Sequence, residues 1–144
     1  MRRVVITGMG IVSSLGNNQQ EVTESLREGR PGIEFSPEAR DNGLRSHICG
    51  TVNIEPKELI DRKLYRFMCP ASAYAYLSMQ EAIEQAGLTD EQIRAHSTGV
   101  ITGAGGASTV ELMDAIDTHR ERGIRRVGPY RVPRTMGSSI NAPL

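Results

Sequence analysis

The sequence contains no tryptophan, few other aromatic residues and only two cysteines. Aromatic side chains make up 4% of the 144 residues, so a core must be built from Ala, Val, Ile, Leu and Met. Cys49 and Cys69 have neither a CxxC nor a Cys/His ligand spacing, which argues against a structural zinc site and against a disulfide framework. The sequence therefore predicts no metal site.

The sequence also lacks an excess of charge and any long apolar run. Lys plus Arg and Asp plus Glu each number 17, so no global field attracts a polyanion or a membrane surface. No window approaches the roughly 18 apolar residues of a membrane span, and no apolar run of signal-peptide length follows the first arginines. A reducing, cytoplasmic setting without nucleic-acid or membrane partners is the expectation.

The most informative stretch is residues 2–18, RRVVITGMGIVSSLGNN. The β-branched run Val4, Val5 and Ile6 predicts a strand buried on both faces. Gly8 and Gly10 resemble the start of a dinucleotide-binding fingerprint, but Ser13 stands at the third glycine position and no ribose-binding acid follows about 20 residues later. The glycines are instead predicted to let the strand approach its neighbours closely.

Local signals predict two well-bounded helices. Residues 19–27 follow a plausible N-cap at Asn18 and precede Gly29, where a left-handed residue can end a helix. Residues 70–86 begin with proline and end before Gly87. Small residues on most faces of this second helix predict a central helix that is packed closely on several sides.

Further along, short elements alternate. The long irregular stretch 31–56 is predicted to contain one short strand within 48–54, and a capping box at Thr89 predicts a short helix to about residue 95. Residues 98–102 predict a second apolar strand, and the glycine turn 103–106 after it suits either an anion site or close backbone packing. A capping box at Ser108 opens a helix to Arg122 that should bury Leu112, Met113 and Ile116.

Two basic clusters are candidate binding surfaces. In DRKLYRFM, Arg62, Lys63 and Arg66 would share one helical face, which is either an ordinary solvated face or a docking point for an acidic partner. The segment 120–134 has little aromatic interleaving for stacking bases, so an acidic protein or a phosphate suits it better than nucleic acid. Its cations are Arg120, Arg122, Arg125, Arg126, Arg131 and Arg134.

Cys69 precedes the helix 70–86, where the helix dipole would lower the pKa of its thiol. It is thus a formal nucleophile candidate. Because no histidine lies near it in the sequence, a buried structural cysteine is the preferred interpretation, and His47 is interpreted as a surface histidine.

Taken together, VVITGMGIVSSLGNN, DRKLYRFM, the GAGG turn and VGPYRVPRTMGSSINAPL resemble the amino-terminal part of the β-ketoacyl-acyl-carrier-protein synthases, in particular the type I bacterial condensing enzymes. The resemblance implies an α/β chain, part of a thiolase-like α/β/α/β/α fold whose first half is incomplete, and a homodimer. Residues 1–144 would form one amino-terminal segment, with the strands 4–12 and 98–102 in its sheet.

The resemblance also implies an activity, the decarboxylative Claisen condensation of acyl groups with malonyl carrier protein in fatty acid elongation, without a cofactor. The family nucleophile would follow shortly after Leu144, where the chain stops within a helix-like segment. No catalytic role transfers to Cys49, Cys69 or the three histidines, so these 144 residues alone are expected to be inactive and poorly stable.

Carrier recognition does transfer to positions of this sequence. Lys63 and Arg66, with Arg122 and Arg125, match the family's basic patch for acyl carrier protein, and Gly105 and Gly106 match a turn near the acyl pocket and the dimer contact. The alternative is a non-catalytic relative, such as a chain-length-factor-like subunit or a carrier-binding fragment, which shares the fold and lacks the nucleophile.

Overall fold

A computed structural model describes residues 3–106 and 108–144, so Arg2 of the opening stretch lies outside the described residues. The elements in chain order are α1 (Gln19–Glu28), β1 (Glu34–Phe35), α2 (Pro37–Asp41), β2 (Ile48–Cys49), α3 (Pro56–Leu59), α4 (Arg62–Tyr65), α5 (Pro70–Ala86), α6 (Asp90–Ile93), α7 (Thr109–Arg122), η1 (Ile124–Arg126), α8 (Arg131–Thr135) and η2 (Gly137–Ile140). None of the helices in this described part is both long and apolar enough to cross a membrane.

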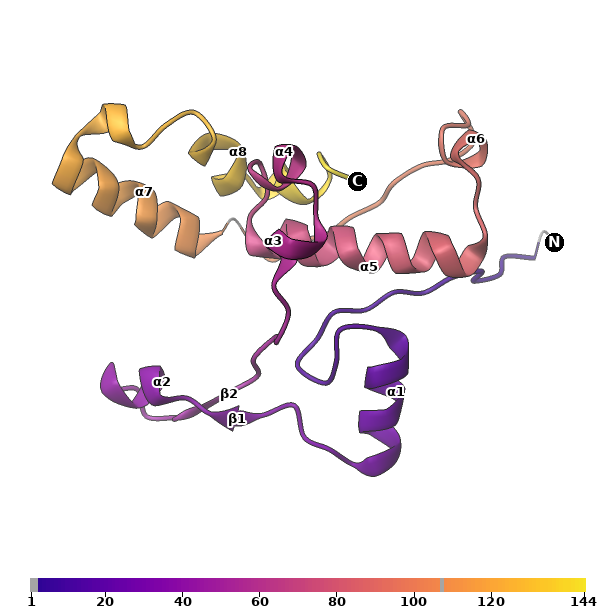
Figure 1. Ribbon diagram of the computed structural model, residues 1–144, viewed down its shortest axis with the longest axis horizontal. Coiled ribbons are helices and arrows are strands. Elements are labelled where there is room, and N and C mark those ends of the chain that lie inside the picture. The colour runs from indigo at the N-terminus through magenta and orange to yellow at the C-terminus, as the bar shows by residue number, and fades with distance from the viewer. Residues whose placement is uncertain (1–2, 107) are drawn as a thin grey trace.

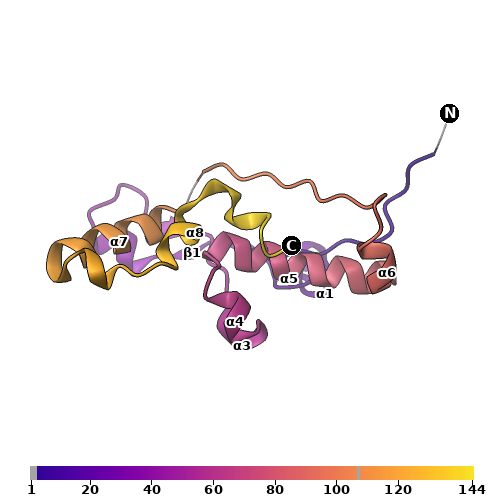
Figure 2. The same ribbon diagram turned by 90° about the horizontal axis from the view of Figure 1, so that it is seen from above.

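The long helix α5 is the element around which the chain is arranged (Figure 1). The segment before α1 runs along one side of α5, and the yellow C-terminal elements α8 and η2 return to the beginning of the helix. Turning the molecule by 90° shows the extended segment between α6 and α7 passing over α5 from one end to the other (Figure 2).

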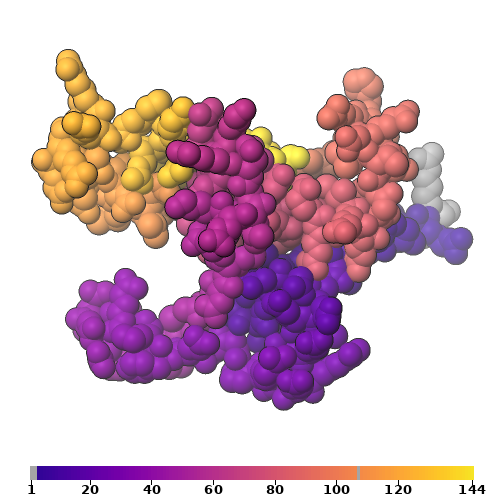
Figure 3. Space-filling model, viewed as in Figure 1, coloured from indigo at the N-terminus to yellow at the C-terminus, as the bar shows by residue number. Residues whose placement is uncertain are grey.

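The stretch between α1 and α3 forms a small hairpin. β1 and β2 pair antiparallel, with Glu34 opposite Cys49 and Phe35 opposite Ile48. The strand predicted within 48–54 is therefore confirmed for two residues, whereas β1 and α2 were not predicted. The hairpin and α2 stand apart from the α7 region in the space-filling view (Figure 3).

The helix boundaries agree closely with the local sequence signals. α1 and α5 end at Gly29 and Gly87, whose φ angles of 65° and 62° are left-handed. The Asn18 side chain accepts a hydrogen bond from the N–H of Glu21, and Thr89 forms the predicted capping box with Gln92. Caps depend on residues only a few positions apart, which is why they can be predicted without knowledge of the fold.

The two predicted strands are absent from the described residues. Residues 4–12 and 98–102 run extended, and Val4 and Ile101 are 94% and 99% exposed. A strand needs a backbone neighbour that completes its ladder of hydrogen bonds. In this structure the opening segment instead donates its N–H groups to side chains of α5, since Met9 N–H donates to Gln85 (2.7 Å) and Ile11 N–H to Glu81 (2.9 Å).

Close approach at Gly8 and Gly10 is confirmed, although the neighbour is a helix rather than strands. An added Cβ would lie closer than 3.0 Å to the carbonyl oxygen of Ala82 at Gly8, and to that of Ser78 at Gly10. Two residues of extended chain advance about 6.6 Å, and four residues of helix advance about 6 Å. Gly8 and Gly10 therefore face successive turns of α5. The two segments therefore pack backbone against backbone in antiparallel directions.

Glu81 joins three segments through both of its carboxylate oxygens. One oxygen accepts from the N–H of Ile11 (2.9 Å), and the other accepts from the N–H of Gln19 (2.8 Å), the first residue of α1. The Gln19 side chain in turn donates to the carbonyl of Met9 and to Gln85. Glu81 thus attaches the opening segment and α1 to α5.

We expect Glu81→Gln to destabilise the complete protein by about 1 kcal/mol, because one of two partly buried N–H donors would lose its acceptor. A glutamine offers one acceptor oxygen, and its NH₂ group would face the second backbone N–H. Glu84→Gln is the matched control, since Glu84 is an exposed carboxylate three residues further along the same helix. Urea unfolding midpoints of the two variants should differ, and equal midpoints would show that Glu81 does not hold these segments.

The apolar core lies where α3, α4 and α5 meet. Ile60, Met68 and Ala73 are buried there, with Leu64 and Leu77 packed against them. Only Ser72 and Ala73 of α5 are buried, so the expectation of a helix enclosed on several sides is wrong for the described residues. The opening segment, α3 and η2 pack against α5, while much of its surface stays partly exposed.

The burial predicted for α7 is also wrong. Leu112 and Met113 are 48% and 54% exposed, Ile116 is half-buried, and the buried residue of this helix is Glu111. Because α7 packs on η1 and α8, the face that it covers is the one holding Glu111. Charge pairing with arginines of α8, described below, makes burial of that carboxylate possible.

Candidate functional site

The single-turn helix α4 presents three cations to solvent. The carboxylate of Asp61 caps the helix by accepting from the N–H of Lys63 (2.8 Å), and Leu64 enters the core. Arg62, Lys63 and Arg66 are all exposed and line one groove, which agrees with the predicted shared face. We call Arg62, Lys63 and Arg66 the α4 basic surface.

Two shallow grooves flank the α4 basic surface, and both include Arg62 and Arg66. One groove of about 390 Å³ is completed by Lys63 and Tyr130. The other, of about 420 Å³, is completed by Lys57, Tyr65 and Arg134. Across residues 3–106 and 108–144, no carboxylate forms a salt bridge with any of the three α4 cations, so their charge is available to an acidic partner.

The second predicted cluster lies elsewhere. Arg122 ends α7 and Arg125 lies in η1, and both side chains are exposed. Both ribbon views place this end of α7 at the edge of the molecule, away from α4 (Figures 1 and 2). The structure therefore presents two basic surfaces and does not join them.

The basic segment 120–134 divides into external and internal arginines. Arg131 contacts Glu111 at 2.6 Å and Asp114 at 3.2 Å, and Arg134 contacts Glu111 at 3.4 Å. Glu111 is nearly buried, and Arg131 and Arg134 are about three-quarters buried. Their positive charge is used to hold α8 on α7, so only the arginines from Arg120 to Arg126 remain as a surface.

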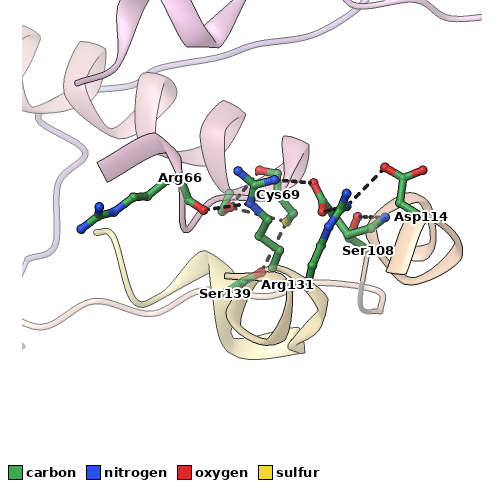
Figure 4. A network of polar contacts seen from close by, with 9 residues as sticks. Arg66, Cys69, Ser108, Asp114, Arg131 and Ser139 are labelled. Carbon is green, nitrogen blue, oxygen red and sulfur yellow. Dashed lines mark hydrogen bonds and ion pairs between the residues drawn. The ribbon is translucent and has the colours of Figure 1, made fainter. Parts of the chain in front are cut away.

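Figure 4 shows how this ion-pair network reaches α4 and α5. Arg134 Nε donates to the backbone carbonyl of Arg66 (2.9 Å), while the Arg66 side chain points away from the network. Ser108 supplies its half of the predicted capping box by accepting from the N–H of Glu111 (3.4 Å). The Glu111 side chain pairs with the arginines instead of completing that box, an outcome that depends on residues 20 and more positions away.

Cys69 is a buried structural residue in this arrangement. Its sulfur lies 3.4 Å from the Ser139 hydroxyl and 3.5 Å from that of Ser72, so it connects the start of α5 to η2. Burial by itself raises the pKa of the thiol, but hydrogen bonding with Ser139, with Ser72 and with the backbone of Ser72 and Ala71 outweighs burial and lowers the pKa overall. The prediction that the pKa of the Cys69 thiol is lowered is confirmed, and hydrogen bonds to the sulfur are the cause.

The glycine turn lies between the extended segment 98–102 and α7. An added Cβ at Gly105 or Gly106 would meet no described atom within 4 Å. Thr102 at the end of the extended segment hydrogen-bonds to Asn141, which follows η2. The described part of the chain contains no group of three or more His, Cys, Asp or Glu side chains arranged to hold a metal ion.

Comparison with known proteins identifies the protein family of this chain. Residues 1–142 match the family profile described as "Beta-ketoacyl synthase, N-terminal domain", and the chain belongs to that family. It is 52% identical to 3-oxoacyl-[acyl-carrier-protein] synthase 1 of Haemophilus influenzae over 145 residues and of Escherichia coli over 146 residues. These alignments include the whole chain, which spans about a third (36%) of each relative.

Solved structures show the same architecture. A beta-ketoacyl synthase from Burkholderia phymatum superimposes with a TM-score of 0.82 at 28% identity, over 99% of this chain and 36% of that one. A type II polyketide ketosynthase solved in complex with its acyl-carrier protein has a TM-score of 0.74 at 17% identity, over 97% of this chain and 37% of that one, and shows the fold alone. The chain therefore has part of the thiolase-like α/β fold of the ketosynthases, as the sequence predicted.

Proposed function

We propose that the complete protein containing this chain is a 3-oxoacyl-acyl-carrier-protein synthase of fatty acid elongation. It would join an acyl group to a malonyl unit on acyl carrier protein by a Claisen condensation in which carbon dioxide is lost. The observation that carries this proposal is the 52% identity to two synthases of that name over the whole chain. A homodimer in the cytoplasm is part of the same proposal.

Within that protein, the segment described here would recognise the carrier. Lys63 and Arg66 would contact acidic residues of acyl carrier protein, and Arg122 and Arg125 would form a second contact. Support comes from the exposure of all four side chains and from the absence, within the described residues, of any salt bridge to Lys63 or Arg66. Arg122 forms a long salt bridge of 3.9 Å with Glu121, and exposed pairs of this kind are weak.

Gly105 and Gly106 would form a turn near the acyl pocket and the dimer contact. The open space beside both residues supports this proposal, because a chain without side chains there leaves room for an acyl group or for a second subunit. None of Cys49, Cys69 or the three histidines is proposed to act in the reaction. For Cys69 this agrees with its burial and with the hydrogen bonds of its sulfur to the hydroxyls of Ser139 and Ser72.

The proposed activity is tested with the complete protein, an acyl carrier protein charged with a medium-length acyl chain, and malonyl carrier protein. We expect carbon dioxide release in step with formation of 3-oxoacyl carrier protein, measured by mass spectrometry of the intact carrier. Carrier binding without condensation would favour the non-catalytic, chain-length-factor-like alternative. Failure to bind any carrier protein would overturn both interpretations.

A further inference from the structure

The Arg66 side chain lies in a corner formed by two aromatic rings. Its guanidinium carbon is 4.9 Å from the ring centre of Phe67 and 5.0 Å from that of Tyr130. The two rings are themselves in edge-to-face contact, with centres 5.2 Å apart and planes at 84°. We call Phe67 and Tyr130 the aromatic corner.

The backbone on both sides of the aromatic corner is held in place by the Glu111 network. Tyr130 immediately precedes α8, whose Arg131 and Arg134 are paired with Glu111. Arg134 also donates to the carbonyl of Arg66. The ring of Tyr130 is thus delivered to Arg66 by a segment more than 60 residues away in the sequence and anchored on α7.

Arg66 differs in this respect from the other cations of the α4 basic surface. Among the described residues, Arg62 and Lys63 form neither a cation–π contact nor a salt bridge, so no such contact orders their long side chains. A cation–π contact with a ring does not use the hydrogen-bonding capacity of a guanidinium, so its N–H groups can still bind a carboxylate or a phosphate. Ordering a long side chain before binding removes a cost that association would otherwise carry.

We propose that Tyr130, together with Phe67, is a positioning residue that holds the Arg66 guanidinium ready for an acidic side chain of the carrier protein. This inference rests on the proposed carrier docking at α4. It assigns a binding role to a residue of the 120–134 segment that carries no charge. It also makes Arg66, rather than Lys63, the geometrically selective cation of this surface, because a flexible ammonium acts as a point charge.

The test compares carrier affinities of variants of the complete protein at constant ionic strength. Tyr130→Ala should weaken carrier binding roughly three- to tenfold through loss of the cation–π contact and of the ordering of Arg66. Tyr130→Phe keeps the ring and should bind as the unchanged protein does. The salt dependence should persist in Tyr130→Ala, because every charge is retained, and should weaken in Arg66→Ala.

Double variants separate positioning from a general structural effect. Tyr130→Ala should cause no further loss in an Arg66→Ala background, and its full loss in a Lys63→Ala background, since the described cation–π contact of the Tyr130 ring is with Arg66. If Arg66→Ala itself leaves the affinity unchanged, the docking proposal fails. If Arg66→Ala weakens binding while Tyr130→Ala does not, or if the two losses add, the positioning role alone is overturned. If Tyr130→Ala does not fold, the same single and double variants are compared with Tyr130→Leu in its place. Leucine retains apolar volume but has no aromatic face.

Discussion

Reversing the charge of Lys63 and Arg66 together, to glutamate, should weaken binding of acyl carrier protein by about 100-fold or more in the complete protein. The change replaces two attractions by two repulsions at an acidic interface, and like charges brought together there cost several kcal/mol. Folding should change little, because both side chains are exposed and neither forms a salt bridge within the described residues. Loss of the Arg66 contacts with the aromatic corner adds at most about 1–2 kcal/mol to the stability change.

The measurement is a titration of the carrier at fixed ionic strength, with circular dichroism as a check on folding. Arg27→Glu with Arg94→Glu is the matched control, because it alters the net charge equally at exposed positions near the ends of α1 and α6. Arg122→Glu with Arg125→Glu tests whether the second basic surface takes part in the same complex. Carrier affinity that is unaltered by the Lys63 and Arg66 reversals would remove α4 from the docking site.

Gly10→Ala should destabilise the complete protein by about 3 kcal/mol. Its new methyl group would lie within 3.0 Å of the carbonyl oxygen of Ser78, which belongs to the middle of α5 and cannot retreat without breaking the helix. The opening segment must therefore move away from α5, which also stretches the hydrogen bond from Ile11 to Glu81. Overpacking that displaces backbone has costs of this size.

Gly29→Ala is the comparison for this prediction. Gly29 has a left-handed φ of 65° and open space around it, so alanine there meets conformational strain without a clash, a cost of about 1 kcal/mol. Urea unfolding midpoints should rank the unchanged protein above Gly29→Ala, and Gly29→Ala above Gly10→Ala. A Gly10→Ala midpoint at or above that of Gly29→Ala would contradict the close packing of the opening segment on α5.

Part of the candidate site could be predicted because it depends on neighbouring residues. The spacing of Arg62, Lys63 and Arg66 places them on one helical face whatever else surrounds the helix. The roles of Glu111, Arg131 and Arg134 could not be predicted in this way. Their pairing joins α7 to α8, and a list of arginines in one segment does not distinguish those that are internal from those that face solvent.

The aromatic corner also depends on contacts between segments that are far apart in the sequence. Phe67 adjoins Arg66 in the sequence, but Tyr130 reaches it only because α8 is held against α7 and α4. One indication was available, since Tyr130 is the sole aromatic residue among the arginines of the 120–134 segment. That pattern is too common to assign a partner without the distance between the ring and the guanidinium.

The sequence by itself determined the family, through four motifs in order, and the limits of α1, α5 and α7, through proline, glycine and capping residues at their ends. The signals at the helix ends act between residues only a few positions apart, so they can be interpreted without knowledge of the fold. Tertiary structure decided which neighbour Gly8 and Gly10 approach, and which arginines remain outside. Both outcomes depend on contacts between residues far apart in the chain, where packing space and charge pairing select one arrangement among many that the local pattern permits.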